Sequence, residues 1–334
     1  MSASTTNPVL LLGGSGVVGT RAARTLRRIQ PELPLVIAGR DAAKAAAVAA
    51  EVGGPTTATT VDLSRPDLGL DPGAVFGAVV TLVKDPWLNS LKYAQARGTA
   101  YVSFASFAFE IGPELAYHVH NPKRAPILML GHLFGGVATL AALHFAREFR
   151  SVEAIALAGV VDPADQGGPV SQADFERLVN DCPSALIRRD GVWRWIGGQE
   201  GARQVVDVTG VPRQGQALPL LDVVSLAAAT DARSLRVDLA ARDEGRGQTP
   251  VTELIIEISG EGHDGKPAHA RHEIVDGDVY ANLSAHGAAL ATERLLGLAG
   301  EPPPAPGYYH PEQLLDPARV VQRVQDLGAS IRST

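Results

Sequence analysis

A glycine-rich turn near the N-terminus constrains the fold of this chain more than any other feature. The apolar run Val9–Leu12 leads into the turn, and an amphipathic helical stretch follows it. Three glycines have the spacing G-x-G-x-x-G, which allows a tight turn, close approach of a pyrophosphate and close helix packing. The alternative is a glycine-rich turn without a ligand. We interpret the segment as a dinucleotide-binding turn formed by Gly14, Ser15, Gly16, Val17, Val18 and Gly19.

Short apolar runs alternate with helical stretches up to residue 130. The expected strands are Val9–Leu12, Leu35–Ala38, Thr57–Val61, Ala78–Val83, Ala100–Val102 and Pro126–Leu130. Alternation at this spacing is typical of parallel βαβ units. Residues 1–130 are therefore expected to form an α/β domain, a Rossmann doubly wound parallel sheet.

After residue 130 the helical signals become fewer. The strand-like segments are Val152–Val160, Val223–Ala227, Leu235–Ala241, Leu254–Ser259 and His269–Ile274, with hairpin turns expected at Asp190-Gly191, Asp264-Gly265 and Asp276-Gly277. Residues 131–284 are expected to form a second α+β domain with a mostly antiparallel sheet, and residues 285–334 a group of C-terminal helices. One face of this apolar sheet is too large to stay in water, which predicts a homodimer built on the second domain.

Composition and charge exclude several classes of partner. A net charge of −6 spread along the chain does not fit nucleic-acid binding, which requires a basic face. No run of about 18 uncharged apolar residues exists, and the N-terminus lacks the features of a signal peptide. The single cysteine, Cys182, fits a reducing compartment. We therefore expect a cytoplasmic protein without nucleic-acid or membrane partners. No acid or cysteine completes a metal site with His263, His269 and His272, so no metal is expected.

The second expected strand ends without the acidic residue that binds the ribose of NAD in many such sites. It ends in Ala38-Gly39-Arg40, so no carboxylate repels a 2′-phosphate and a guanidinium is available to pair with it. We therefore predict NADP (NADPH) as the cofactor. The alternative is NAD, with Asp41 binding the ribose. Beyond the turn, the predicted cofactor-binding residues are Arg40, Lys44 in the next helix, and Asp62 after the third strand.

These segments resemble the saccharopine dehydrogenase-like family of NAD(P)-dependent oxidoreductases. The resemblance is carried by the glycine turn, Ala38–Asp41 with Lys44, Val79–Val83, Gly98–Val102, and Gly307–Glu312 with Leu327-Gly328. It departs from the family pattern at Ser103, where Asp is frequent, and at Gly131–Gly136. The resemblance implies that the middle domain binds substrate and dimerises, that the C-terminal helices pack back on the Rossmann domain, and that C=N or C=O bonds are reduced.

Candidate catalytic residues follow the fourth, fifth and sixth expected strands. Ligands of open α/β sheets bind beyond the carboxyl ends of the strands, which places Lys84, Ser103 and His132 near the nicotinamide. An unperturbed histidine has a pKa near neutrality, which suits His132 to proton transfer, and Lys84 could act as an acid or base if it were desolvated. The alternatives are that Lys84 is exposed to solvent and that His132 caps the following helix.

Together these patterns predict an NADPH-dependent oxidoreductase that transfers a hydride to a C=N or C=O bond of a small molecule. The Tyr-x-x-x-Lys pattern of short-chain reductases does not occur in the sequence. The alternative is a sensor or regulator that binds NADP without turnover, because a fold does not by itself imply a function.

Overall fold

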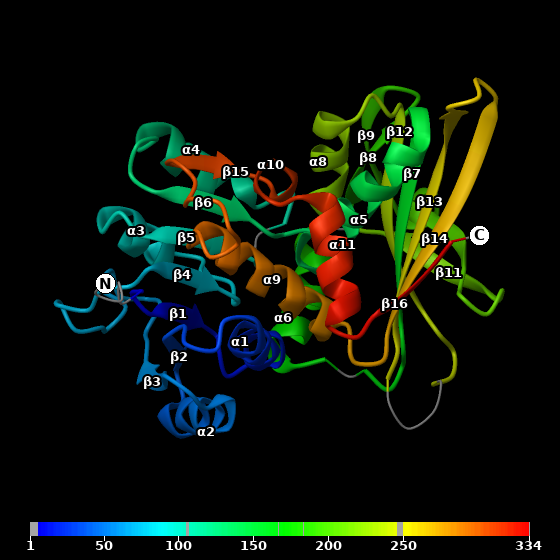
Figure 1. Ribbon diagram of the computed structural model, residues 1–334. Coiled ribbons are helices and arrows are strands. Elements are labelled where there is room, and N and C mark those ends of the chain that lie inside the picture. Colours follow the sequence, from blue (N-terminus) through cyan, green and yellow to red (C-terminus); the bar gives the residue numbers. More distant parts are fainter. Residues whose placement is uncertain (1–5, 105–106, 166, 183, 246–249, 334) are drawn as a thin grey trace. The chain divides into compact units, whose positions relative to one another are not determined.

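The computed structural model describes residues 6–104, 107–165, 167–182, 184–245 and 250–333. The chain forms two compact units, and most elements of both are labelled in Figure 1. The Rossmann unit holds Met1–Ser106, Glu110–Leu130 and Ala285–Leu314. The second unit holds Phe107–Phe109, Gly131–Ser284 and Leu315–Thr334.

The sheet of the Rossmann unit has seven strands in the order β3-β2-β1-β4-β5-β6-β15, and all neighbouring pairs are parallel. The strands are β1 (Val9–Leu12), β2 (Leu35–Gly39), β3 (Thr56–Thr60), β4 (Ala78–Thr81), β5 (Ala100–Ser103), β6 (Pro126–Met129) and β15 (Gly307–Tyr309). The order reverses at β1, which pairs with β2 on one side and β4 on the other. This confirms the predicted doubly wound parallel sheet, whose ligands bind beyond the carboxyl ends at the reversal.

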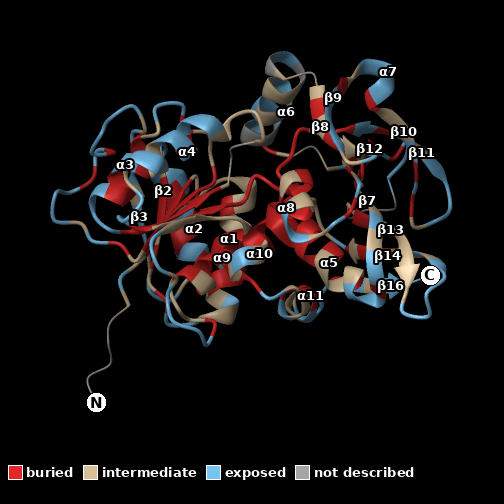
Figure 2. Cartoon of the chain, turned by 90° about the horizontal axis from the view of Figure 1, so that it is seen from above, coloured by how far each residue is buried: buried red, intermediate tan, exposed pale blue. Residues whose placement is uncertain are grey.

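Helices cover the sheet, and for this reason the central strands are continuous apolar runs. Every residue of β1 is fully buried, and Figure 2 shows the buried residues concentrated on the central strands. In α1, Ala22 and Leu26 are buried while Arg24 and Arg28 are exposed, as the helical period requires. The helices are α1 (Val17–Ile29), α2 (Ala42–Val52), α3 (Asn89–Ala96), α4 (Ile111–His120), α10 (Pro311–Leu314) and most of α9 (Ala281–Leu295).

The nine-stranded sheet of the second unit has the order β10-β11-β12-β7-β13-β14-β16, with β8 paired to β12 and β9 paired to β8. The strands are β7 (Phe149–Val161), β8 (Ser184–Arg189), β9 (Val192–Gly197), β10 (Ala202–Val206), β11 (Pro212–Ala217), β12 (Ser234–Ala241), β13 (Thr252–Gly262), β14 (Pro267–Asp276) and β16 (Ser330–Ser333). The β12–β7 pair is parallel and the other pairs are antiparallel. The predicted mostly antiparallel sheet is confirmed.

Two local predictions for this unit were wrong. Val223–Ala227 is not a strand but part of α8 (Asp222–Ala229), because Val223 and Leu226 are buried at helical spacing and Asp222 favours a helix start. Asp276-Gly277 does not close a hairpin, since the chain passes from β14 towards α9. The other helices of the unit are α5 (Val137–Phe145), α6 (Pro169–Asp181), α7 (Gly198–Gly201) and α11 (Pro317–Asp326).

The sheet of the second unit is less apolar than the sequence predicted. Arg203 and Arg236 pair with the fully buried carboxylate of Asp238, and Arg203 and Arg271 pair with Glu257. These ion pairs place charged side chains on the sheet where an apolar face was expected. The homodimer stays a prediction, and its original reason does not apply to these strands.

The last fifty residues, expected as C-terminal helices that pack back on the Rossmann domain, divide between the two units. β15 extends the Rossmann sheet beside β6. α11 packs on α5 through a buried valine face, and β16 pairs with β14. Among the residues described, no helix is long and apolar enough to cross a membrane.

Candidate cofactor and active site

The glycine turn between β1 and α1 leaves no room for side chains at Gly14 and Gly19 and little room at Gly16. Gly13 has φ +78°, a left-handed conformation that favours glycine. A Cβ at Gly14 would lie 2.8 Å from the carbonyl oxygen of Leu11, and a Cβ at Gly19 would lie 2.3 Å from that of Gly13. At Gly16 the nearest atom to such a Cβ would be 3.1 Å away. Gly19 is thus required by helix packing, and Gly16 is the position left for close approach of a ligand.

The start of α1 is open to an anion. Gly16 is the N-cap residue, and no side chain accepts a hydrogen bond there. The amide groups that begin a helix have no partners within the helix, and they bind phosphate groups when they are not capped. The predicted contacts at Ser15, Val17 and Val18 lie at this point. The turn therefore fits the pyrophosphate of a dinucleotide.

The end of β2 lies beside the same turn. A Cβ at Gly39 would be 3.1 Å from Oγ of Ser15, so a larger residue here would contact the turn. Arg40 and Lys44 are exposed, and neither side chain has a partner among the residues that the structure describes. Asp41 is the N-cap of α2 and accepts a 3.0 Å hydrogen bond from the Lys44 backbone. Two exposed cationic side chains thus lie near the end of β2, and the carboxylate of Asp41 is engaged by α2.

Asp62 follows β3 and shapes its own loop. Its Oδ1 accepts hydrogen bonds from the backbone (3.0 Å) and the hydroxyl (2.6 Å) of Ser64. These two bonds, the hydroxyl first, lower the pKa of the exposed Asp62 carboxyl. One carboxylate oxygen is therefore occupied by the turn, and the predicted contact to the cofactor stays a prediction.

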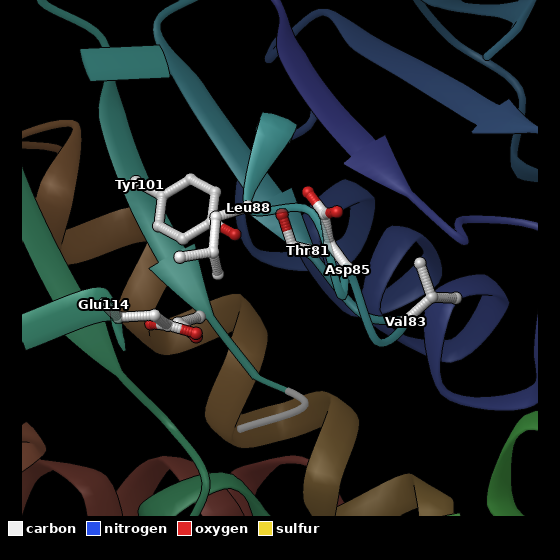
Figure 3. Close-up of a pocket in the computed structure, with 7 residues that line it drawn as sticks. Thr81, Val83, Asp85, Leu88, Tyr101 and Glu114 are labelled. Carbon is white, nitrogen blue, oxygen red and sulfur yellow. The ribbon is translucent and has the colours of Figure 1, made fainter. Parts of the chain in front are cut away.

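A small polar cavity lies at the carboxyl ends of β4 and β5 (Figure 3). Thr81 and Ser103 end these strands and lie opposite each other in the register. The cavity has a volume of about 10 Å³, which is room for a single water molecule rather than a nicotinamide ring. It is lined by Thr81, Val83, Asp85, Leu88, Tyr101, Ser103 and Glu114.

Ser103 and Glu114 form a buried pair at this cavity. The Ser103 hydroxyl donates a 3.0 Å hydrogen bond to Oε1 of Glu114, and both residues are 3% exposed. Glu114 comes from the first turn of α4, a helix that the sequence patterns did not reveal. A titratable carboxyl beside a hydroxyl at the strand ends has the composition of a proton-transfer site. Of the three predicted catalytic residues, Ser103 is the one that lines the cavity.

Behind the cavity, Tyr101 and Asp85 are linked through Ser90. Oγ of Ser90 lies 2.7 Å from Oδ2 of Asp85 and 2.9 Å from Oη of Tyr101. Burial, followed by the charge of Glu114, raises the pKa of Tyr101 well above its usual range. Burial and Glu114 also raise the pKa of Tyr308 on β15. Both phenols therefore stay protonated at neutral pH, and neither acts as a base there.

Lys84 is placed after β4 as predicted, but it forms an ion pair. Its Nζ lies 2.8 Å from Oε1 of Glu110, and its side chain is 26% exposed. Pairing with a carboxylate favours the charged ammonium. The Lys84 side chain is therefore engaged by Glu110, and its catalytic role stays a prediction.

His132 belongs to the second unit, where it precedes the short 3₁₀ helix η1 (Leu133–Gly136). Its imidazole is 5% exposed, and Nε2 lies 2.8 Å from Oγ of Ser225 on α8. The neighbouring Asp222 carboxylate accepts from the Leu133 amide (2.7 Å) and the Thr139 hydroxyl (2.6 Å). His132 is thus part of a buried polar cluster that connects η1, α5 and α8.

No group of three His, Cys, Asp or Glu residues suited to a metal ion occurs within the described ranges. His263 contacts a backbone carbonyl, and His272 contacts Ser333 and Glu148. The carboxylates of the Rossmann cavity are engaged by hydroxyl and amide donors.

The sequence matches no protein-family model and no curated protein. Among solved structures, the chain is similar to saccharopine dehydrogenase (L-Glu forming) from Saccharomyces cerevisiae, with a TM-score of 0.73, 14% identity, and coverage of 98% of this chain and 100% of the other. It is also similar to amine dehydrogenase from Mycobacterium smegmatis, with a TM-score of 0.50, 11% identity, and coverage of 94% and 97%.

These likenesses establish the fold. The chain has a saccharopine dehydrogenase-like fold over almost its whole length, which confirms the resemblance seen in the sequence at the level of architecture. At 14% identity or less, function has to be argued from the site itself.

Proposed function

We propose that this chain is an NADPH-dependent oxidoreductase that transfers a hydride to a C=N or C=O bond of a small molecule. The observation that carries the proposal is the uncapped start of α1 at Gly16, beside a strand end that reads Gly39-Arg40. The first feature fits a pyrophosphate, and the second fits a phosphorylated ribose.

The residues that would hold the cofactor follow from this geometry. The amides of Val17 and Val18 begin the helix and would receive the pyrophosphate. Arg40 and Lys44 have exposed cationic side chains without partners in the described structure, and they would pair with the 2′-phosphate. Asp41 supports this choice over NAD, because its carboxylate caps α2.

NADPH supplies the hydride when it is bound, so the protein has to orient the acceptor and deliver a proton. We assign the proton to the Ser103–Glu114 pair at the carboxyl ends of the strands. Ser103 can donate its hydroxyl proton to the nitrogen or oxygen of the acceptor and take a proton from Glu114 in the part of the cycle in which that carboxyl is in its acid form, because a hydroxyl both donates and accepts. Burial of the pair keeps bulk water from competing for that proton.

The names of the two proteins of similar fold guide the order in which C=N and C=O acceptors are tested. One is a saccharopine dehydrogenase and the other an amine dehydrogenase, so imines come first in a substrate panel. Keto acids and aldehydes come second.

The proposal is tested by titrating NADPH and NADH into the wild type and Arg40→Ala. We expect NADPH to bind at least ~10-fold tighter than NADH, a difference of about 1.4 kcal/mol, and Arg40→Ala to remove most of the gap. Equal affinities in the wild type would refute the cofactor assignment. NADPH binding without oxidation by any compound of the panel would instead indicate the sensor alternative.

A further inference from the structure

We infer that the cavity at the ends of β4 and β5 binds one water molecule, which donates hydrogen bonds to Tyr101 and Glu114 and accepts one from Thr81. The volume of about 10 Å³ matches a single water. The direction of each hydrogen bond around the cavity supports this inference. It does not depend on the proposed function, except where turnover is measured.

The direction of the hydrogen bonds is fixed first at Asp85. Its Oδ1 accepts from the amide of Trp87 (3.1 Å), and its Oδ2 accepts from the amide and the hydroxyl of Ser90 (both 2.7 Å). A carboxylate can only accept, so the Ser90 hydroxyl donates to Asp85. A serine hydroxyl carries one proton, and that proton is therefore used.

The contact between Ser90 and Tyr101 then has one direction. Oγ of Ser90 lies 2.9 Å from Oη of Tyr101, and since Ser90 has no second proton, Tyr101 donates and Ser90 accepts. The phenol oxygen presents lone pairs to the cavity that it lines. A ligand in the cavity must therefore donate to Tyr101.

Glu114 imposes the same requirement from α4. Its carboxylate accepts from Ser103 at 3.0 Å, and a carboxylate has about four lone-pair sites. A small ligand that reaches Glu114 and Tyr101 together must carry two donors, and water is the smallest molecule that does.

Thr81 provides an independent observation. It lines the cavity and is 3% exposed, and its hydroxyl lies near enough to Tyr101 to lower the pKa of that phenol, yet it makes no hydrogen bond of full geometry to any described residue. Buried hydroxyls in native proteins bond to protein or to ordered water, because an unsatisfied one is costly. The oxygen of the same water, after donating twice, is free to accept from Thr81.

Melting of the wild type, Thr81→Val and Thr81→Ser tests the inference without substrate. Valine has the shape of threonine but no hydroxyl. If water binds the hydroxyl, Thr81→Val should lower the unfolding midpoint by about 2–6 °C, and Thr81→Ser should keep most of the stability. Thr139→Val is the matched control, since the hydroxyl of the fully buried Thr139 donates to Asp222 at 2.6 Å. An unchanged or higher midpoint for Thr81→Val, with the expected loss for Thr139→Val, would overturn the inference.

A crystal structure at about 1.6 Å resolution gives the second test. We expect one water within about 3.2 Å of the Thr81 hydroxyl, Tyr101 Oη and a Glu114 oxygen. A dry cavity would overturn the inference. Ammonium is another donor of this size, so midpoints in ammonium chloride and sodium chloride should agree. A higher midpoint in ammonium chloride than in sodium chloride would show that the cavity binds a cation, and it would overturn the assignment of water.

The kinetic consequence rests on the proposed function. A water between Glu114 and Tyr101 makes Thr81 a positioning residue for the Glu114 proton. Thr81→Val should then lower kcat several-fold and reduce the solvent deuterium isotope effect, and it should leave the KM for NADPH unchanged. Thr81→Ser should restore kcat. If no turnover is found with any acceptor, the proposed function fails, while melting and crystallography still decide the water.

Discussion

Ser15 and Gly39 lie against each other, so that a Cβ at Gly39 would be 3.1 Å from the Ser15 hydroxyl oxygen. This proximity links the glycine turn to the end of β2, although the two residues are far apart in sequence. A side chain introduced at Gly39 would therefore project beside the place proposed for the ribose.

We expect Gly39→Asp to reverse the cofactor preference. The new carboxylate would repel a 2′-phosphate and offer acceptors to a ribose 2′-hydroxyl, so NADPH affinity should fall ~10-fold or more and NADH affinity should rise. Calorimetric titration with both cofactors measures this. Gly39→Asn is the control of equal size, and an equal loss of NADPH affinity in both variants would show that volume and not charge is responsible.

Gly16→Ala and Gly19→Ala should separate cofactor binding from stability. A Cβ at Gly19 would lie 2.3 Å from a backbone oxygen, so this variant should lose about 1–3 kcal/mol of unfolding free energy. At Gly16 the nearest contact is 3.1 Å and φ is −81°, so the alanine variant should fold normally and bind NADPH poorly. Urea denaturation and NADPH titration test both. Normal NADPH binding by Gly16→Ala would contradict the assignment of the turn.

Glu114→Gln should reduce turnover without weakening NADPH. The amide accepts the Ser103 hydrogen bond but cannot supply a proton, and the loss of a positioned acid typically lowers the rate ~10²–10⁴-fold. Steady-state kinetics with the best acceptor of the panel and NADPH titration provide the measurement. The control is Glu110→Gln, which removes the partner of Lys84. A similar fall in turnover in both variants would show that the change in local charge is responsible, and not the loss of the Glu114 proton.

His132→Asn should affect stability rather than catalysis. The imidazole is 5% exposed and bonded to Ser225, so the variant should lose about 1–3 kcal/mol of unfolding free energy. Turnover per folded molecule should stay within about tenfold of the wild type, below the usual contribution of a catalytic acid. A loss of turnover above 100-fold with unchanged stability would restore the catalytic role predicted from the sequence.

The free energy of unfolding should fall as the pH drops below about 6.5, partly through His272. Burial lowers the pKa of His272 in the folded protein, although Glu148 opposes this. As the pH falls, the unfolded chain therefore takes up the proton before the folded protein does. The contribution of His272 to the free energy of unfolding is complete above about pH 6.5 and is lost as the pH falls towards the folded pKa. Urea midpoints at pH 7.5 and 5.5 test the sign.

His272→Gln should flatten this pH dependence, and the stacking of the ring on Phe145 at 3.8 Å should be lost at both pH values. His269→Gln on the same strand is the control, because His269 is exposed. An equal slope in the wild type and His272→Gln would contradict the assignment.

The Rossmann strands could be predicted because their signals are local. Val9–Leu12 is an uninterrupted apolar run, and the glycine spacing after it is tied to backbone geometry. Asp41 caps α2 through a hydrogen bond from the Lys44 amide, and an acid just before a helical stretch is a local signal of this kind. In each case the deciding neighbours lie within a few residues in sequence.

The candidate site could be predicted less well because distant segments form it. Ser103 was found from its position after a strand, but Glu114 meets it only because α4 packs beside β5. A single acid within an apolar segment was the one signal for Glu114. β15 was missed for a similar reason, since three residues carry too little pattern to indicate a partner as distant as β6.

Because Gly307–Tyr309 belongs to the Rossmann sheet, fragments that lack the C-terminal segment have an incomplete sheet. A ribosome that has released residues 1–130 has produced six of the seven strands of that sheet, and β6 keeps an open edge until β15 emerges. A fragment that ends near residue 130 therefore exposes a strand edge prone to pairing with other chains. A stop codon just before Gly307 would remove β15 from one sheet and β16 from the other, so a single late truncation weakens both units.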